Sequence, residues 1–381
     1  MYRIYYAEKD TTLYENHVTR NTGVDEILEL TKVASGSILN GHIMANTYNS
    51  RILIDFGTEI TSLSQSISEA TIPAINVGSI ASASVFLNLH AADAEDVIDT
   101  YTVEAYAVSE SWDNGLGVYG NQPSTKVGAS WENRKGDPAG LNAVAWNTAS
   151  ADGHYSGATV STGGGTWMTS DVSSETFINR APDIRIDVTN IVSKLVNNTL
   201  PNYGFILKRP NVEEINGDVY GSLKFFSRDS HTIYVPRLEV CWDDSIIGSS
   251  DNVITSNTYV PYIKNIKNEY RTSERARFFI GVRPEFPTKS YTTGSWYQTT
   301  DLLPISSSYE IIDSVTNDII IKDEKIFGNS TTKISTNLSD GSFFDLRMDS
   351  FMPERYYKIK LTCRRTNDTQ TFDDFYFKVV N

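Results

Sequence analysis

The sequence predicts an all-β protein that contains two β-sandwich domains. Apolar and polar residues alternate along many short segments, which is the pattern of strands that place one face on a core. Clusters of turn residues separate these segments at short intervals, as in sandwiches and barrels. The chain has 381 residues, which is too many for one ordinary domain. We therefore expect one domain in residues 1–245, a linker in 246–258 and a second domain in 259–381.

The first domain opens with several predicted strands. The segment at 27–30 suits either a strand or a helical turn, because its apolar residues fit both periods. Between 91 and 100 an acidic loop joins two strands, the kind of connection that a sandwich needs. The clearest strands are residues 2–6, 51–56, 82–90 and 101–108.

Residues 203–244 contain three further strands separated by turn residues. In the last of them Leu238, Val240 and Trp242 alternate with Arg237, Glu239 and Cys241, which predicts a half-buried strand. Three strands cannot bury both of their faces, so we expect them to pair with strands from earlier in the chain. Just before them, residues 187–196 carry apolar residues at helical spacing after Asp187 or Thr189 as a cap. They predict one short helix.

A polar stretch at 109–182 carries four of the six tryptophans. A structureless loop of this length is unusual in a compact domain, so we expect an elaborated insertion folded over one end of the sandwich. Its aromatic side chains have two interpretations. They anchor loops onto the core, or some of them stack on sugar rings of a glycan. The candidate glycan contacts are Trp131, Trp146, Tyr155 and Trp167.

The C-terminal domain shows the same alternation in residues 277–283, 319–322, 355–363 and 374–380. About 120 residues of short alternating strands predict a small immunoglobulin-like sandwich. Residues 251–381 hold 17 basic and 17 acidic residues, so the first 250 residues carry the whole net charge of −14. An acidic surface repels phosphates, which argues against nucleic-acid binding.

The amino terminus lacks a basic start followed by an apolar run, and no segment approaches the length of a membrane span. We therefore expect a soluble protein made in a cytoplasm. Cys241 and Cys363 fall in different predicted domains; a disulfide between them stays open, and two ordinary strand cysteines are the favoured alternative.

No catalytic motif occurs, and we expect no enzymatic activity and no cofactor. The adjacent carboxylates Glu213/Glu214, Asp243/Asp244 and Asp373/Asp374 are expected at solvated edges and turns. A structural Ca²⁺ remains an alternative, because the acidic loops at 93–99 and 112–117 offer oxygen ligands.

Several blocks of the sequence stand out as specific motifs. They include RNTGVDEILEL, SRILIDFG, SESWDNGLG, NYGFILKRP and LKFFSRDSHTIYVPRLEVCWDDS, together with GSFFDLRMDSFMPERYYKIK near the end. These blocks resemble virion structural proteins of contractile-tailed phages, especially cyanophages and other marine phages. The first domain is also similar in layout to DNRLRE-type jelly-roll domains. This resemblance implies a jelly-roll-type sandwich in residues 1–245.

The resemblance implies a structural or accessory protein of the tail, neck or capsid surface. It would act in the virion through contacts with other virion proteins and as a homo-oligomer. The alternative is a glycan-binding module of a fibre or baseplate that recognises a host surface polysaccharide.

Overall fold

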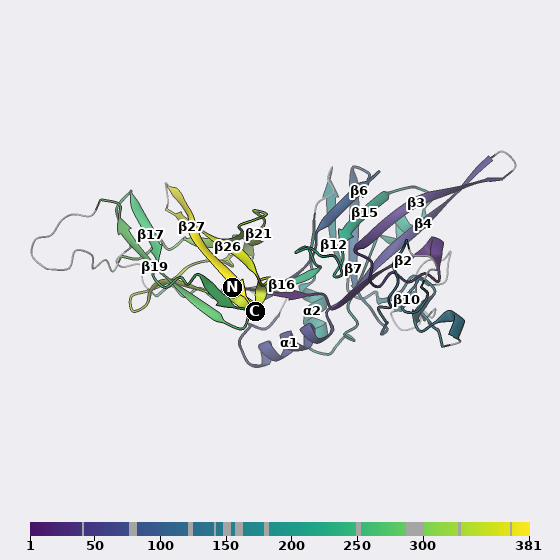
Figure 1. Cartoon of the computed structure of the whole chain (residues 1–381), viewed down its shortest axis with the longest axis horizontal. Coiled ribbons are helices and arrows are strands. Elements are labelled where there is room, and N and C mark those ends of the chain that lie inside the picture. Colours follow the sequence, from purple (N-terminus) through teal and green to yellow (C-terminus); the bar gives the residue numbers. More distant parts are fainter. Residues whose placement is uncertain are drawn as a thin grey trace, which may run out of the picture. The chain divides into compact units, whose positions relative to one another are not determined.

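The computed structural model describes the chain except for residues 40–41, 76–81, 121–124, 141, 148–153, 157–162, 179–182, 249–252, 287–300, 327–328 and 366–367. The side chains of residues 35–39, 42–46, 154–156 and 329 are also outside the description. The predicted all-β sandwich class is confirmed, since strands dominate the described residues (Figure 1). The chain forms two compact units. One contains Tyr5–Val77 and Ser84–Glu239, and the other contains Met1–Ile4 and Val240–Asn381.

The first unit is organised around an eight-stranded sheet with the strand order β12-β7-β14-β4-β3-β15-β6, in which β2 also pairs with β4. All of the strand pairings in this sheet are antiparallel. Its strands are β2 (Lys9–Tyr14), β3 (Ile27–Leu39), β4 (His42–Asp55), β6 (Ala91–Glu95), β7 (Thr100–Ala107), β12 (Ser173–Ile178), β14 (Phe205–Lys208) and β15 (Gly221–Phe226).

A four-stranded sheet has the order β1-β16-β5-β13, with β1 (Tyr2–Tyr6), β5 (Ser84–Leu89), β13 (Ile184–Asp187) and β16 (Arg237–Cys241). The three late strands β14, β15 and β16 do not pair with one another. Each lies between two strands from earlier in the chain. This placement confirms the expectation that the three strands need earlier strands to bury their faces.

The prediction that the strand at 237–241 is half-buried is wrong, because every residue of β16 is buried. Its charged residues are paired instead of solvated. Arg237 Nη2 lies 3.0 Å from Glu239 Oε1, and Arg185 Nε lies 3.1 Å from Glu239 Oε2. These cations hold the pKa of Glu239 below its usual value, although burial opposes them. Alternation alone therefore did not reveal that both faces of this strand are buried.

The prediction of a single helix is also wrong. The helix expected at 187–196 is α2 (Thr189–Val196), and Asp187 Oδ1 accepts a hydrogen bond of 3.0 Å from the backbone N–H of Thr189. The described residues contain two more α-helices, α1 (Gly57–Ser68) and α3 (Asn211–Ile215). In α1 the buried residues Ile60 and Leu63 are spaced by one turn, so a narrow apolar stripe suffices to dock a helix rich in serine and threonine.

The second unit contains two more sheets, with the orders β17-β19-β25-β24 and β18-β27-β26-β20-β21. Aromatic rings join them. Phe278 of the first sheet stacks on Phe344 at 5.2 Å and lies 6.0 Å from Phe377 of the second. The strands are β17 (Tyr259–Ile263), β18 (Glu269–Arg271), β19 (Arg275–Pro284), β20 (Ser308–Asp313), β21 (Ile319–Ile321), β24 (Ser335–Asn337), β25 (Gly341–Arg347), β26 (Arg355–Arg364) and β27 (Thr369–Val380).

Short ribbons complete the fold. The pairs are β8 (Asn133–Lys135) with β9 (Val144–Ala145), β10 (His154–Ser156) with β11 (Thr166–Met168), and β22 (Lys325–Ile326) with β23 (Asn329–Ser330). The segment predicted as a linker is hydrogen-bonded at Ile246, Gly248 and Ile254 to residues of the second unit. Whether it acts as a linker stays a prediction.

The β3–β4 hairpin projects beyond the rest of its sheet (Figure 1). Pairing of β15 with β3 ends at Lys32, and pairing of β2 with β4 ends at Ser50. Beyond these points β3 and β4 continue to pair with each other, from Val33↔Tyr48 to Leu39↔His42. We call residues 33–48 the hairpin arm.

Candidate functional site

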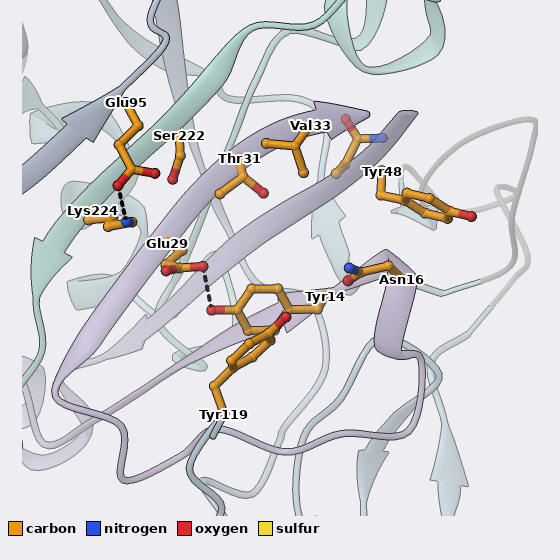
Figure 2. A pocket seen from close by; sticks show the side chains of 11 residues that line it. Tyr14, Asn16, Glu29, Thr31, Val33, Tyr48, Glu95, Tyr119, Ser222 and Lys224 are labelled. Atoms are coloured by element: carbon orange, nitrogen blue, oxygen red, sulfur yellow. Dashed lines mark hydrogen bonds and ion pairs between the residues drawn. The ribbon is translucent and has the colours of Figure 1, made fainter. Parts of the chain in front are cut away.

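A pocket lies on one face of the eight-stranded sheet in the first unit, where β3, β15 and β6 run side by side (Figure 2). Glu29, Thr31 and Val33 alternate along β3 with buried residues, so they share one face. On β15, Ser222 pairs with Thr31 and Lys224 pairs with Glu29 in the strand register. The regular period of the sheet thus gathers polar side chains into one floor. Its lining residues are Tyr14, Asn16, Glu29, Thr31, Val33, Tyr48, Asn49, Glu95, Tyr119, Ser222 and Lys224.

Three tyrosines form the sides of this pocket. Tyr14 ends β2, Tyr48 lies on β4 and Tyr119 comes from the long insertion. The rings of Tyr14 and Tyr119 meet with centroids 4.8 Å apart and planes tilted by 49°. The Tyr14 hydroxyl donates a 2.9 Å hydrogen bond to Glu29 Oε2. Tyr48 and Tyr119 are half-buried, so each keeps part of its ring exposed.

The backbone at Tyr119 is held on both sides although it belongs to a loop. Asp25 Oδ2 accepts a hydrogen bond of 2.8 Å from its N–H. Arg20 Nη1 donates one of 2.9 Å to its carbonyl oxygen, and the Arg20 guanidinium lies 4.9 Å from the Tyr119 ring centroid. These contacts fix the ring before any ligand arrives.

The pocket carries more negative than positive charge. Lys224 Nζ lies 3.0 Å from Glu95 Oε1 and 3.7 Å from Asp93 Oδ2. Its hydrogen bond to Glu95 raises the pKa of Lys224. Burial raises the pKa of Glu29, against the lowering effect of its hydrogen bond from Tyr14. The Lys224 charge is therefore already engaged by acidic neighbours.

One buried polar atom of the floor lacks a partner. The Ser222 side chain is only 6% exposed, and its Oγ has no hydrogen-bond partner among the described residues. A buried hydroxyl without a partner costs about 1–3 kcal/mol.

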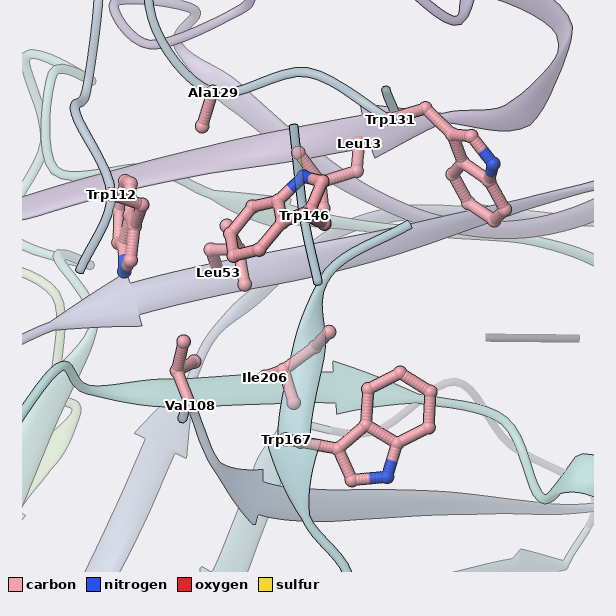
Figure 3. Packing of buried hydrophobic residues seen from close by; sticks show 9 residues of the cluster. All are labelled: Leu13, Leu53, Val108, Trp112, Ala129, Trp131, Trp146, Trp167 and Ile206. Atoms are coloured by element: carbon pink, nitrogen blue, oxygen red, sulfur yellow. The ribbon is translucent and has the colours of Figure 1, made fainter. Parts of the chain in front are cut away.

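The tryptophans that the sequence offered as glycan contacts lie elsewhere. Trp131, Trp146 and Trp167 are 0–2% exposed and form one hydrophobic cluster with Trp112, Leu53 and Ile206 (Figure 3). This burial is the arrangement expected of the core-anchoring alternative and leaves no ring face open for stacking. The side chain of Tyr155 lies outside the described residues.

The cluster is tied to polar partners at its edges. Trp146 Nε1 donates to the Ser130 carbonyl at 2.9 Å, and Trp112 Nε1 donates to the Tyr203 carbonyl at 2.9 Å. The Arg51 guanidinium lies 4.8 Å from the Trp131 ring centroid and 5.0 Å from that of Trp167. The loop is thus fastened to the sheet through β4.

The expectation that Glu213/Glu214 lies at a solvated turn is wrong for Glu214. Its side chain is 3% exposed, and its carboxylate forms a bidentate pair with Arg51 at 3.0 and 2.8 Å. Lys208 Nζ lies 3.2 Å from the same carboxylate. The adjacent acidic residues Asp373 and Asp374 are exposed, as expected. The placement of Glu214 on α3 next to β4 is a tertiary contact that the local sequence does not encode.

Three of the acidic residues that were offered as Ca²⁺ ligands are paired with lysines. Asp113 pairs with Lys135 at 3.6 Å, and Asp93 and Glu95 pair with Lys224. In the described part of the chain, no group of three or more His, Cys, Asp or Glu side chains is placed to hold a metal ion. The structural Ca²⁺ stays a prediction. Cys241 and Cys363 are buried thiols that are not joined by a disulfide, and no helix among the described residues is long and apolar enough to span a membrane.

The comparisons with known proteins are sparse. The sequence matches no protein-family model and no curated protein. Among solved structures, a β-glucuronidase of Parabacteroides merdae aligns with 97% of this chain at 8% identity and a TM-score of 0.16. The chain spans 35% of the glucuronidase chain. A similarity this weak carries no argument about function.

Proposed function

We propose that this protein is a non-enzymatic structural or accessory component of a phage particle, in the tail, the neck or the capsid surface. It acts through contacts with other virion proteins and as a homo-oligomer. Two observations support this. The sequence blocks named above resemble virion proteins of contractile-tailed phages, and the hairpin arm is an element suited to docking on a neighbour.

The hairpin arm is the observation that carries the proposal. A two-stranded ribbon is marginally stable in water on its own. This one extends for seven further residue pairs, Val33↔Tyr48 to Leu39↔His42, past the strands that flank it. Its sequence includes Ile38, Leu39, Ile43 and Met44. Among the described residues, the outer edges of the arm pair with no further strand, so they offer backbone groups for strand addition. A neighbouring subunit that covers the arm would contact these apolar residues and would pair with the backbone edges.

The test compares wild type with a variant that lacks the arm. Residues 34–47 are replaced by Asn-Gly, a two-residue turn that suits the paired positions Val33 and Tyr48. We expect the purified variant to unfold at the same denaturant concentration as wild type. We also expect it to be lost from purified phage particles when mass spectrometry measures its copy number.

Two results would reject the proposal. One is the absence of the wild-type protein from purified particles. The other is incorporation of the shortened variant at the wild-type copy number.

A further inference from the structure

We propose that the pocket on the eight-stranded sheet binds an uncharged sugar ring, such as a hexopyranose unit of a neutral glycan. We call it the tyrosine pocket, after Tyr14, Tyr48 and Tyr119. This inference stands apart from the proposed role in the particle. It rests on the size, the aromatic rings, the hydrogen-bonding groups and the charge of the pocket.

The size of the pocket suits a small ligand. Its volume is about 270 Å³. Pockets for drug-sized molecules begin at roughly 300 Å³. The pocket is slightly smaller than that, so the space fits one ring rather than a long segment of polymer. Three of the lining residues, Asn16, Val33 and Glu95, are exposed, so the pocket is open to solvent. A terminal sugar, or one unit of a chain passing over the opening, could therefore enter.

The tyrosines provide surfaces that a pyranose recognises. One face of a pyranose is made of C–H groups, and it packs well against an aromatic ring. Tyr48 and Tyr119 both line the pocket and are half-buried, and Tyr119 lies beside Tyr14 (Figure 2). Because the backbone of Tyr119 is hydrogen-bonded at both its N–H and its carbonyl, its ring is in place before binding. Little conformational entropy is then lost when a sugar docks.

The floor provides partners for hydroxyl groups. A sugar hydroxyl both donates and accepts, and hydrogen bonds to ionised groups are the stronger ones. Glu29 engages Tyr14 through Oε2, and its Oε1 has no hydrogen-bond partner among the described residues. Ser222 Oγ in the same floor is unpaired and is a second partner, which a ligand reaches once the short serine side chain rotates toward the pocket. A ligand without hydroxyl groups would leave both unsatisfied.

The charge of the pocket selects against acidic sugars. Glu29 and Glu95 contribute two carboxylates, and Lys224 is already paired with Glu95 and Asp93. A uronic or sialic acid would place a third carboxylate beside them without a free cation among the described lining residues. The same argument disfavours phosphorylated ligands. A neutral hexose meets no such repulsion.

The test uses the full chain and defined sugars. Isothermal titration and ligand-observed NMR would measure binding of glucose, galactose, mannose and N-acetylglucosamine and of their short oligosaccharides. Glucuronate and N-acetylneuraminate serve as the acidic counterparts. We expect saturable binding of at least one neutral sugar, and binding of the acidic sugars at least tenfold weaker.

Three variants locate the binding to this pocket. Tyr48→Ala removes a ring that lines the pocket, Glu29→Gln keeps an acceptor for Tyr14 but removes the charge, and Ser222→Ala removes the unpaired hydroxyl. Each should weaken binding about tenfold, which corresponds to the loss of one good contact. Tyr356→Ala is the matched control, because Tyr356 is 54% exposed on β26 in the other unit. It should bind sugar like wild type.

Ser222→Ala also protects the test against misfolding, because deleting an unpaired buried hydroxyl should not lower the unfolding midpoint. Failure of every neutral sugar to bind would overturn the proposal. So would binding that Ser222→Ala and Tyr48→Ala leave unchanged in folded protein, or acidic sugars that bind as tightly as neutral ones.

Discussion

The buried pair of Arg51 and Glu214 offers the sharpest test of how the first unit is held together. Arg51 projects from β4 and is fully buried, and Glu214 on α3 is 3% exposed. Their two hydrogen bonds measure 3.0 and 2.8 Å. Arg51 also donates to the Gly164 carbonyl at 2.7 Å, so it joins the helix and the tryptophan loop to the same strand. We predict that Glu214→Gln strongly destabilises the unit.

The magnitude follows from the charge that the substitution leaves behind. At 2.8 Å and an effective dielectric constant near 20, the attraction is about 6 kcal/mol, and desolvation of both groups offsets part of it. Glutamine can still accept one hydrogen bond, but Arg51 and Lys208 then lose their shared counter-charge. Breaking a buried pair in this way costs about 3–5 kcal/mol. That is a large fraction of the 5–15 kcal/mol that keeps a typical protein folded.

Urea denaturation followed by tryptophan fluorescence is a suitable assay, since Arg51 lies against Trp131 and Trp167. With a slope of about 3 kcal/mol/M, the midpoint of the first unit should fall by roughly 1–1.7 M. Glu274→Gln is the matched control. Glu274 pairs with Lys267 at 3.3 Å at an exposed site, where a pair contributes about 0–1 kcal/mol. The reasoning is refuted if Glu214→Gln shifts the midpoint no further than Glu274→Gln does.

Three further predictions concern single positions of the first unit. Burial raises the pKa of Asp10 to about 7. Between about pH 4 and 7 the folded state therefore keeps a proton that the unfolded state has released. The free energy of unfolding then falls as the pH rises through this range. Asp10→Asn should therefore match wild type below pH 4 and be more stable at pH 8, by about 1.4 kcal/mol for each unit of that raised pKa; equal urea midpoints at pH 8 would contradict this. Trp146→Ala should cost about 3–5 kcal/mol in denaturation experiments, because it empties a buried site and leaves the Ser130 carbonyl unpaired; a loss below 1 kcal/mol would speak against the cluster. Gly204→Ala should lower the free energy of unfolding by about 1–3 kcal/mol, since Gly204 has φ +84° and a Cβ there would lie 2.1 Å from the Ile54 carbonyl oxygen. Gly217→Ala is the control, because Gly217 has open space around it, and urea denaturation should find this variant nearly as stable as wild type.

The sequence predicted several strands correctly, but the expectation of an acidic loop between 91 and 100 is wrong for Ala91–Glu95, which form strand β6 beside β15. Alternation found β5, β7, β26 and β27 because one face of each meets a core and the period of two is local. The same pattern misjudged β16. The alternation predicts that its polar face meets solvent, but Glu239 is buried and pairs with Arg237 and Arg185. The pairing with Arg185 is a tertiary contact that no local pattern predicts. Helix α1 was missed because its serines and threonines favour loops, and only tertiary packing selects the helix.

The tyrosine pocket could not have been located from the sequence. The conspicuous residues of the insertion are its tryptophans, which suggested a binding surface at Trp131, Trp146 and Trp167. These rings are buried, whereas the pocket draws on Tyr14, Tyr119 and polar residues of four strands. Alternation along β3 does place Glu29 and Thr31 on one face. It does not say that β15 and β6 pair beside them.

The buried tryptophans nevertheless contribute to the pocket, because they anchor the loop that carries Tyr119. Tyr119 lies in the insertion between Trp112 and Trp131, which are buried at its two ends. The side chain of Asn21, itself buried, donates to the carbonyls of Asn114 and Ala129 and accepts from the Gly117 N–H. A long polar loop would otherwise lose much conformational entropy on binding a ligand. Anchoring its ends in the core lets a loop residue serve as a rigid wall of a pocket whose floor is a sheet.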